Sequence, residues 1–339
     1  MGRLLRTLQS GQKLQTCASG TDLSWARNLI PVGLAVAENT TICRGCTRLC
    51  VGEACTMCAM QIDLHCHSRC SDGKLDPIDL VQRAADAGVS YLSITDHDTV
   101  SAYKELANRD LPVSLIPGIE FSTQWNGKGI HVLGLDIDPL DPAIVSACRS
   151  QQVAREERAR QIALKLEQKG VKKAWENAKA HAGSAGIGRI HFATVVVEQG
   201  LAEDLPQAFK RLLGDGKPAS VRADWMSLED VNECIRNAGG IPVLAHPMKY
   251  KFTRTRLLRL LGDFKAAGGR GMEVVSGRQS AQETAEMSRL CRESGLLASC
   301  GSDFHEPGRM WAELGRFPPL PSACLPVWTR FRNPPNISE

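Results

Sequence analysis

The sequence has little net charge, few aromatic side chains and no long apolar run. Aromatic residues make up 5% of the 339 positions and charged residues 23%, which suits a soluble globular protein and excludes a disordered, collagenous or coiled-coil chain. No apolar stretch reaches the roughly 20 residues that a membrane helix needs, so an integral membrane protein is excluded. The formal charge is only +4, so bulk electrostatic attraction of nucleic acid is not implied, although a local basic patch is not excluded.

The first 60 residues contain no histidine but six of the 13 cysteines. An odd number of cysteines in a chain of this length favours free thiols in a reducing compartment, so we expect a cytoplasmic protein. Two CxxC pairs, Cys43 with Cys46 and Cys55 with Cys58, have a spacing that can close a tetrahedral zinc site. The alternative, which we favour, is that residues 1–59 are a disordered or non-native leader.

From residue 60 onward, short apolar runs alternate with helical patterns. This rhythm is typical of an α/β protein with a mainly parallel sheet or a barrel. Asp76 and Pro77 predict the start of a helix, with Asp as N-cap and Pro at the first helical position. Asn126-Gly127, between the apolar runs Phe121–Trp125 and Ile130–Leu135, predicts a hairpin.

Residues 150–225 lack strand alternation, so we expect a helical insertion there, inside a domain that spans residues 60–320. Arg155–Arg160 has the spacing of a charged, exposed helix face. Trp175, Trp225 and Trp311 are expected in the core or between the subdomains. The proline-rich segment 321–339 is expected to fray at the surface.

Six of the eight histidines stand at the ends of expected strands or in the loops beside them, together with several acids. The groups, in chain order, are His65-Cys66-His67, Asp72-Gly73, Thr95-Asp96-His97-Asp98, Gly118-Ile119-Glu120, His131, Ala245-His246-Pro247 and Gly301-Ser302-Asp303-Phe304-His305. In a barrel of parallel strands, such ends converge on one face. Unpaired buried carboxylates are costly, so this mixture calls for cations, and Mn²⁺, Zn²⁺ or Fe²⁺ suits its oxygen and imidazole ligands.

These motifs, in this order, resemble those of the PHP (polymerase and histidinol phosphatase) family of metal phosphoesterases. The match runs from about Met60 to Gly315 and is interrupted by the helical insertion. Within the family, the sequence is most similar to the branch of 3′,5′-nucleoside bisphosphate phosphatases and the 5′-to-3′ exoribonuclease RNase AM. The resemblance implies a distorted (β/α)7-type barrel with a three-metal centre, Mn²⁺ being the expected ion.

Carried over motif by motif, the resemblance assigns nine residues to three metals. The first metal takes His65, His67, Glu120 and Asp303; the second shares Glu120 and adds His131 and His246; the third takes Asp72, His97 and His305. Of these, Asp72, His97, Asp303 and His305 are expected to act most directly in catalysis. Asp96 or Asp98 is a candidate for orienting His97.

Four further residues are expected to bind substrate. Arg189 and His191 lie in a cluster with Phe192 that is suited to a 5′-phosphate and a base, although capping is the alternative for His191. Lys217 and Arg278 are candidates for phosphate contact; the alternatives are a solvated turn lysine and a surface charge at a helix start. The basic stretch Lys249–Arg259 begins beside His246 and could guide a polyanion.

The expected function is metal-dependent hydrolysis of phosphate esters. The substrates would be the 3′-phosphate of nucleoside 3′,5′-bisphosphates, short 5′-phosphorylated oligoribonucleotides trimmed in the 5′-to-3′ direction, or both. The alternatives are a histidinol-phosphate-type phosphatase and a non-catalytic module that binds zinc or nucleic acid. No membrane and no obligate protein partner is expected.

Overall fold

The computed structural model describes residues 40–41, 50–51, 61–183 and 185–335. The chain divides into two units, Met1–Met60 with Asn336–Glu339, and Gln61–Pro335. In the first unit, β1 (Thr40–Thr41) pairs antiparallel with β2 (Cys50–Val51). The expected zinc ligands Cys43, Cys46, Cys55 and Cys58 lie outside the described residues.

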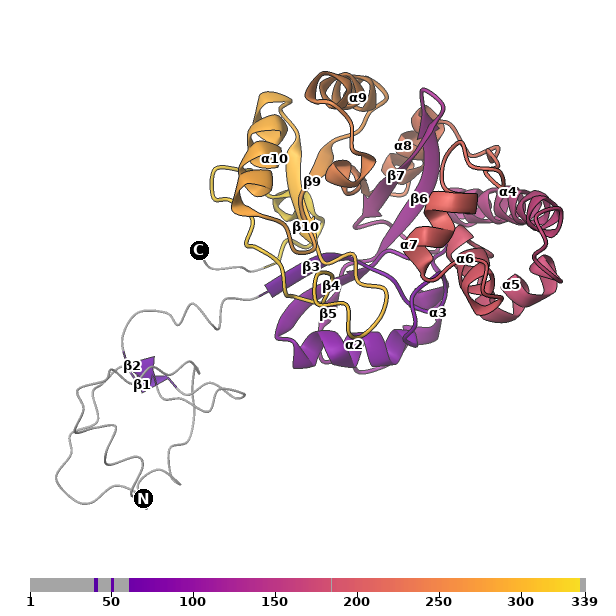
Figure 1. Cartoon of the computed structure of the whole chain (residues 1–339). Coiled ribbons are helices and arrows are strands. Elements are labelled where there is room, and N and C mark those ends of the chain that lie inside the picture. The colour runs from indigo at the N-terminus through magenta and orange to yellow at the C-terminus, as the bar shows by residue number, and fades with distance from the viewer. Residues whose placement is uncertain (1–39, 42–49, 52–60, 184, 336–339) are drawn as a thin grey trace, which may run out of the picture. The chain divides into compact units, whose positions relative to one another are not determined.

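The second unit is built on two sheets (Figure 1). The smaller one is parallel and contains β3 (Gln61–Cys66), β4 (Val89–Ile94) and β5 (Ser114–Leu115) in this order. The larger one has the order β10 (Leu297–Gly301), β9 (Gly271–Ser276), β8 (Ile241–Leu244), β7 (Lys128–Leu135) and β6 (Gly118–Trp125). Its strands β8, β9 and β10 are parallel, whereas β6, β7 and β8 pair antiparallel.

Isolated bridges join the two sheets into a distorted ring. Cys66 bridges to Phe304 just after β10, and His97 just after β4 bridges to Glu120 on β6. The ring therefore runs from β3 through β4 to β5 and the start of β6, which pair in the same register with β4 and the residues after it, and on through β7, β8 and β9 to β10. The α/β class with a mainly parallel, barrel-like arrangement is confirmed, although bridges rather than continuous strand pairing link the sheets.

The antiparallel arm of the ring is the expected hairpin. β6 and β7 pair from Gly118↔Leu135 to Trp125↔Lys128, which leaves Asn126 and Gly127 as a two-residue turn. Both turn residues have positive φ, 47° and 72°, the conformation of a type I′ turn that asparagine and glycine tolerate best. The hairpin places Glu120 and His131 on neighbouring strands.

Helices cover the outside of both sheets. Figure 1 shows α2 (Pro77–Asp86) and α3 (Ser101–Leu106) beside β3–β5, and α8 (Leu228–Asn237), α9 (Arg254–Ala266) and α10 (Ala281–Glu293) beside the larger sheet. The expected start of α2 is confirmed, with Asp76 as N-cap and Pro77 as the first helical residue. None of the described helices combines the length and apolarity that crossing a lipid bilayer requires.

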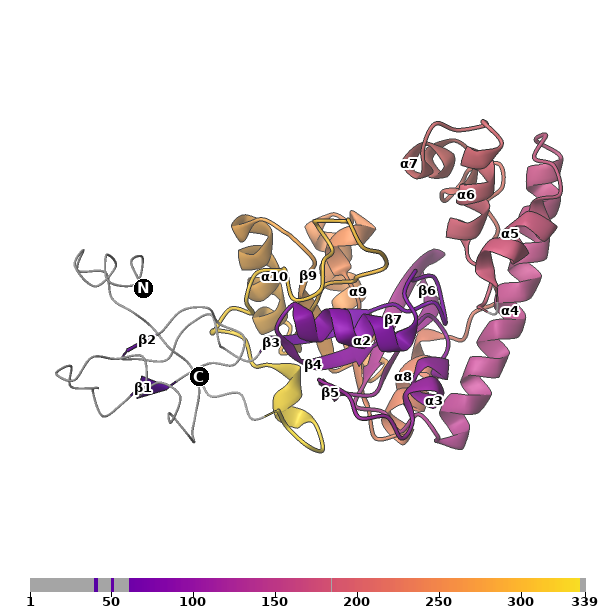
Figure 2. The same ribbon diagram turned by 90° about the horizontal axis from the view of Figure 1, so that it is seen from below.

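The insertion between β7 and α8 forms its own helical body (Figure 2). It contains α4 (Pro142–Glu167), α5 (Ala174–Ala182), α6 (Arg189–Glu198), α7 (Leu205–Ala208) and the π-helical turn η2 (Phe209–Leu213). Leu166, Phe192, Val196 and Leu213 are fully buried in a core of these helices. This separate core keeps the insertion in a defined shape beside the barrel.

The C-terminal segment differs from the frayed tail that its prolines suggested. Residues 327–330 form the 3-10 turn η4, and Val327 and Phe331 are buried. Arg332 donates hydrogen bonds to both the side chain and the backbone oxygen of Asp136. Apolar side chains spaced between the prolines thus attach residues 321–335 to the domain; residues 336–339 lie outside the described part.

Candidate metal centre

The nine histidine and acidic residues singled out in the sequence gather in one place: seven lie at or after the carboxyl ends of β3, β4, β8 and β10, and Glu120 and His131 come from within the β6–β7 hairpin. The strands bring them from five places: β3 and the loop after it, the end of β4, the β6–β7 hairpin, the end of β8 and the loop after β10. Four overlapping groups of ligand atoms lie within 4.8 Å of one another: His67, Asp72, His97 and His305; His65, His246 and Asp303; His65, His67 and Glu120; and His97, Glu120 and His131.

Two imidazoles and two carboxylates face one point at the end of β3. His65 Nε2 and His67 Nε2 are 3.2 Å apart, and Glu120 Oε2 lies 3.3 Å and 3.2 Å from them. Asp303 Oδ1 is 3.4 Å from both nitrogens. Because His65 Nδ1 lies 3.0 Å from Glu273 Oε1, its proton belongs there and the Nε2 lone pair faces the centre.

Electrostatics at this point favour a positive charge. Burial on its own lowers the pKa of His65, but Glu273 and Glu120 outweigh it and raise the pKa to about 10. Glu120 is fully buried, which raises its pKa, yet His97, His131 and His65 bring the pKa well below its usual value. A divalent cation among these acceptor atoms would neutralise the buried carboxylates as a protonated imidazole does, but with two positive charges.

The other oxygen of Glu120 faces the next pair of imidazoles. Its Oε1 lies 2.9 Å from His131 Nδ1 and 2.9 Å from His246 Nε2, and these two nitrogens are 3.3 Å apart. One carboxylate therefore stands between two imidazole pairs. This is the bridging position that the resemblance implied for Glu120.

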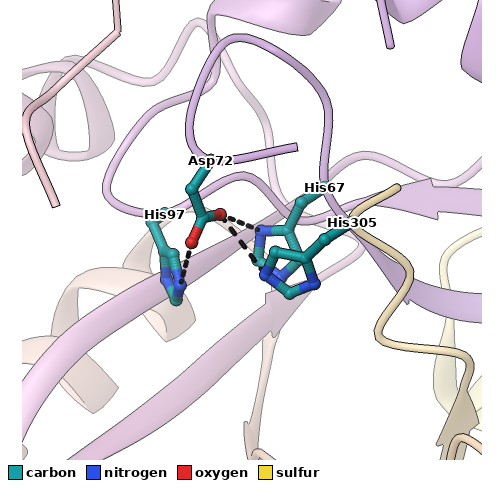
Figure 3. Close-up of side chains that lie close together, drawn as sticks. All are labelled: His67, Asp72, His97 and His305. Atoms are coloured by element: carbon teal, nitrogen blue, oxygen red, sulfur yellow. Dashed lines mark ion pairs between the residues drawn. The ribbon is translucent and has the colours of Figure 1, made fainter. Parts of the chain in front are cut away.

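Asp72 is the centre of the third group (Figure 3). Its oxygens lie 3.4 Å from His305 Nε2, 3.6 Å from His67 Nδ1 and 3.8 Å from His97 Nε2. Burial raises the pKa of Asp72, but His305 and His97 outweigh it and hold the pKa well below its usual value. His67 was expected at the first metal alone; the structure places its other nitrogen in this group as well.

The donors present fit divalent cations. Burial lowers the pKa of His97 to about 3 and that of His246 to about 4, so both rings are neutral at pH 7, as metal ligands must be. Imidazole nitrogens and carboxylate oxygens without sulfur suit Mn²⁺, Zn²⁺ or Fe²⁺. The clusters are thus able to hold metal ions.

The comparisons with known proteins agree with this geometry. A family model described as PHP domain matches residues 63–182. A 5′-3′ exoribonuclease from Haemophilus influenzae is 42% identical over 271 residues, which cover 79% of this chain and 98% of that protein. The chain belongs to the PHP domain family. The resemblance inferred from the strand-end motifs is therefore confirmed.

Two further relatives of the PHP domain come from Chromobacterium violaceum. A 3′,5′-nucleoside bisphosphate phosphatase is 40% identical over 272 residues, which cover 79% of this chain and 95% of that protein. An amidohydrolase structure with bound sulfate has a TM-score of 0.74 and 38% identity, and it covers 81% of this chain and 99% of its own. The likeness thus includes the helical insertion as well as the barrel.

Around the metal centre, the PHP domain holds its ligands with buried acids. Glu273 on β9 accepts from the backbone N–H of His246 at 2.6 Å in addition to contacting His65. The sequence reasoning missed it; the signal was an acid inside the apolar run Met272–Val275. Asp63 accepts from the backbone N–H groups of His65, Ser302 and Gly315, which ties β3 to the end of β10.

The two acids beside His97 bind other partners, contrary to the expectation that one of them orients its ring. Asp96 accepts from Ser68 and Ser71 and so fixes the loop after β3. Asp98 is fully buried, accepts from Ser122 and pairs with Arg155 of the insertion. The two acids thus shape the backbone on both sides of His97.

The backbone is strained where several of these residues sit. His246 and Asp303 have φ of 29° and 53°, in the left-handed region that non-glycine residues rarely occupy. At Gly301, a Cβ would overlap the Cβ of His65, so only glycine lets β10 approach β3 here. This close approach brings Asp303 to the imidazoles of β3.

A hollow of about 720 Å³ opens over the metal centre; we call it the main hollow. Its wall includes Asp72, His97, His131, Asp303 and His305 and seven basic side chains, those of Lys74, Arg155, Arg158, Arg189, Lys249, Arg278 and Arg309. Burial, followed by the nearby Arg189 and Arg155, lowers the pKa of Arg158 to about 9. Guanidinium groups this close together favour a bound anion.

Of the four expected substrate-binding residues, the structure brings two to the main hollow. Arg189 and Arg278 line it, whereas His191 and Lys217 do not. Lys217 is exposed on the turn after η2. His191 is 4% exposed, and its Nδ1 accepts from the backbone N–H of Gly188 at 3.0 Å. His191 therefore takes the capping role that was its alternative.

This capping role makes stability sensitive to acid. Burial is the main cause that lowers the pKa of His191 from 6.5 to about 4. Between these pH values His191 is protonated in the unfolded chain but neutral in the folded protein. The free energy of unfolding therefore falls as pH drops below about 6.5. His191→Gln keeps an acceptor at this position. Between pH 7 and pH 5, the free energy of unfolding should fall in the parent protein by about 1–2 kcal/mol more than it falls in His191→Gln.

Urea unfolding of the metal-free protein at the two pH values measures this difference. His181→Gln is the matched control, because His181 lies on the insertion too but is exposed and pairs with Glu198. An equal loss of stability in the His191 variant and the parent would contradict the assigned cap.

Proposed function

We propose that this PHP domain hydrolyses the 3′-phosphate of nucleoside 3′,5′-bisphosphates and trims short 5′-phosphorylated RNA in the 5′-to-3′ direction. The observation that carries the proposal is one hollow that holds both the clustered metal ligands and, beside them, the basic group Arg155, Arg158 and Arg189. Both substrates present a phosphate ester to the ligands and a second, terminal phosphate a nucleoside away. The relatives named above act on these two classes of substrate.

In the proposed reaction, one set of residues would bind the metal ions and another would bind the 5′-phosphate of the substrate. Divalent cations, for which we propose Mn²⁺, would supply the Lewis acidity that activates water and offsets charge on the phosphoryl oxygens. His65, His67, Glu120 and Asp303, then Glu120, His131 and His246, then Asp72, His97 and His305 are the proposed ligand sets. Arg158 and Arg189 would bind the 5′-phosphate, and Arg155 offers a buried Nε that lacks a partner among the described residues.

Two side chains at the mouth of the main hollow, those of His305 and Lys249, are held by contacts with Asp303. His305 Nδ1 lies 2.9 Å from the backbone oxygen of Asp303, so its proton points there and the Nε2 lone pair faces Asp72. Lys249 is half-exposed, and its ammonium pairs with Asp303. We propose that Lys249 stabilises charge that develops on the departing oxygen, while Asp72 and His305 hold the third cation.

The helical insertion limits which substrates enter. It lies on one side of the metal centre and carries Arg158 on α4 and Arg189 on α6. A wall on this side favours the end of a strand over the middle of a duplex. A histidinol-phosphate-type phosphatase is the second candidate, and the insertion with its guanidinium group is the observation against it.

We also propose that the protein works in the cytoplasm. The seven cysteines of residues 61–335, among them Cys66 next to the proposed ligands, are all free thiols. Whether the leader binds zinc does not bear on the proposed hydrolysis.

The test is a direct assay with two substrates. Purified protein with Mn²⁺ should release inorganic phosphate from a nucleoside 3′,5′-bisphosphate and 5′-mononucleotides from a 5′-phosphorylated oligoribonucleotide. Asp72→Ala and His305→Ala should each lower both rates by several orders of magnitude, since metal catalysis supplies much of the barrier reduction. Asp79→Ala, on the exposed first turn of α2, is the control.

The outcomes separate the candidates. A rate within tenfold of the parent for both site variants would reject the third ligand set. Rapid hydrolysis of histidinol phosphate with none of either nucleotide substrate would favour the second candidate. Removal of divalent ions with a chelator should stop the reaction, and Mn²⁺ should restore it.

A further inference from the structure

The main hollow has two unlike sides. On one side stand the helices of the insertion, with Arg158, Arg189 and Phe209 in the wall. On the other stand the loop after β9 (residues 276–278) and the loop after β10 (residues 302–312). Figures 1 and 2 both place α6 and α7 on the opposite side of the domain from β9 and α10. The metal ligands lie between the two sides.

The side away from the insertion continues into a second hollow of about 640 Å³. Its wall is formed by Arg278, Gln279, Gly308, Met310, Glu313, Gly315, Arg316, Phe317 and Pro318. Arg278 lines both hollows, so the two meet at its side chain. A polymer that leaves the metal centre on this side has a path along the surface.

Two large apolar side chains stand exposed beside this path. Trp311 is 62% exposed and Met310 is 74% exposed, although the tryptophan was expected in the core or at a subdomain contact. The backbone holds Trp311 in place, because its carbonyl oxygen accepts from the N–H of Arg278 at 2.7 Å. Among the described residues, no aromatic ring stacks on Trp311. The backbone of Trp311 is thus held beside Arg278, and its exposed indole has a face free for a ligand.

The charge around the path is positive. Neither Arg278 nor Arg316 forms an ion pair within the described part of the chain. The one acid in the wall of the second hollow, Glu313, is already neutralised by Arg83, with contacts of 3.0 Å and 2.7 Å. Free guanidinium groups that flank an exposed indole are the combination that binds single-stranded nucleic acid.

We infer that the second hollow and Trp311 form the binding track for the RNA chain on the 3′ side of the cleaved bond. The inference rests on the proposed function and deepens it. The 5′-phosphate would lie against Arg158 and Arg189, in the wall that the insertion contributes to the main hollow. The following nucleotides then run past Arg278, where one base stacks on Trp311 and a phosphate meets Arg316. A nucleoside 3′,5′-bisphosphate has no nucleotide on the 3′ side of its cleaved ester, so it has nothing to place along this track.

The track predicts an effect of substrate length. The value of kcat/KM for 5′-phosphorylated RNA should rise from two to six nucleotides in the parent. Trp311→Ala should remove most of this rise and lower the hexanucleotide-to-bisphosphate ratio of kcat/KM by about tenfold, the usual worth of one stacked base. Trp311→Phe should restore most of the ratio, because phenylalanine keeps an aromatic face.

Arg316→Ala should lower the same ratio by about threefold to tenfold and make hexanucleotide binding less sensitive to salt. The matched control is Arg330→Ala, which removes another exposed arginine, on η4. Equal losses on both substrates, or an unchanged ratio in Trp311→Ala, would overturn the track. Hydrolysis of neither substrate by the parent protein would instead overturn the proposed function, so the two failures are distinguishable.

Discussion

Glu120→Gln should lower bound metal to a small fraction of the parent's content and the rate of phosphate release on the order of a thousandfold. The reason is the number of groups that this carboxylate serves. Its two oxygens lie between 2.9 and 3.3 Å from nitrogens of five imidazoles, those of His65, His67, His97, His131 and His246. An amide keeps the shape but removes the negative charge and turns one acceptor into a donor.

The loss of charge matters because the site is buried. Glu120 is fully buried, and the surrounding imidazoles hold its pKa well below the usual range against the effect of burial. Metal content by mass spectrometry and phosphate release under saturating Mn²⁺ measure the two effects. Glu156→Gln is the control, since Glu156 is an exposed glutamate on α4 whose ion-pair partner among the described residues is Arg160. A variant with parental metal content and a rate within tenfold would show that Glu120 does not bridge the ligand sets.

The sequence was sufficient to find the residues of the candidate metal centre because most of them follow strands that can be recognised locally. His67, His97, His246 and Asp303 each come within three residues after the end of a short strand, and parallel strands bring such positions to one face. Asn126-Gly127 predicted the hairpin by the same local logic, since its turn requires two residues with positive φ. The motif order then indicated the family.

Burial of single charged residues could not be predicted in this way. Arg155 stands in a helix whose pattern suggested an exposed face, yet it is buried beside Asp98. Asp98 lies 57 positions earlier in the chain, so the helix pattern alone gives no sign of this partner. Glu273 contacts His65 across 208 positions, and nothing within either segment indicates that contact. Long-range pairing of this kind depends on how the elements pack, which local periodicity does not encode.

Three other differences have the same origin. His191 lies two positions after Arg189 in sequence but turns inward to cap its own helix, because residues two apart on a helix point in different directions. Trp311 is exposed because it stands in the loop after β10, where its carbonyl oxygen accepts from Arg278 just after β9 and its side chain points away from the core. The segment 321–335 packs against the domain because Val327 and Phe331 find apolar partners that proline content does not reveal.

The pairing of Arg155 with Asp98 gives a prediction of comparable size for stability. Arg155→Met should lower the free energy of unfolding by about 3–5 kcal/mol, because it leaves a buried carboxylate without its counter-charge. Asp98 is fully buried, and burial raises its pKa while Arg155 and His97 bring the pKa below its usual value. The arginine also lies over the ring of Trp225 at 5.3 Å and donates to Ser122.

The double variant Asp98→Asn/Arg155→Met distinguishes a lost charge pair from lost packing. The introduced amide carries no charge but keeps an acceptor for the N–H of Ser122, which in the parent lies 2.7 Å from the carboxylate of Asp98. If the uncompensated carboxylate is the cause, the double variant should recover at least half of the loss, because the buried charge is gone. Urea unfolding of the metal-free proteins measures all four members of the cycle.

Arg160→Met supplies the matched comparison on the same helix. Arg160 also pairs with a carboxylate, that of Glu156, but the two side chains are 55% and 57% exposed. Exposed pairs contribute little, so the loss should stay below about 1 kcal/mol. Similar losses for Arg155→Met and Arg160→Met, or a double variant less stable than Arg155→Met, would mean that Asp98 is not held by charge. The insertion would then be attached to the loop of His97 by packing and by the hydrogen bonds that Gln151 and Gln152 donate to Asp98, and its position would not depend on the ion pair.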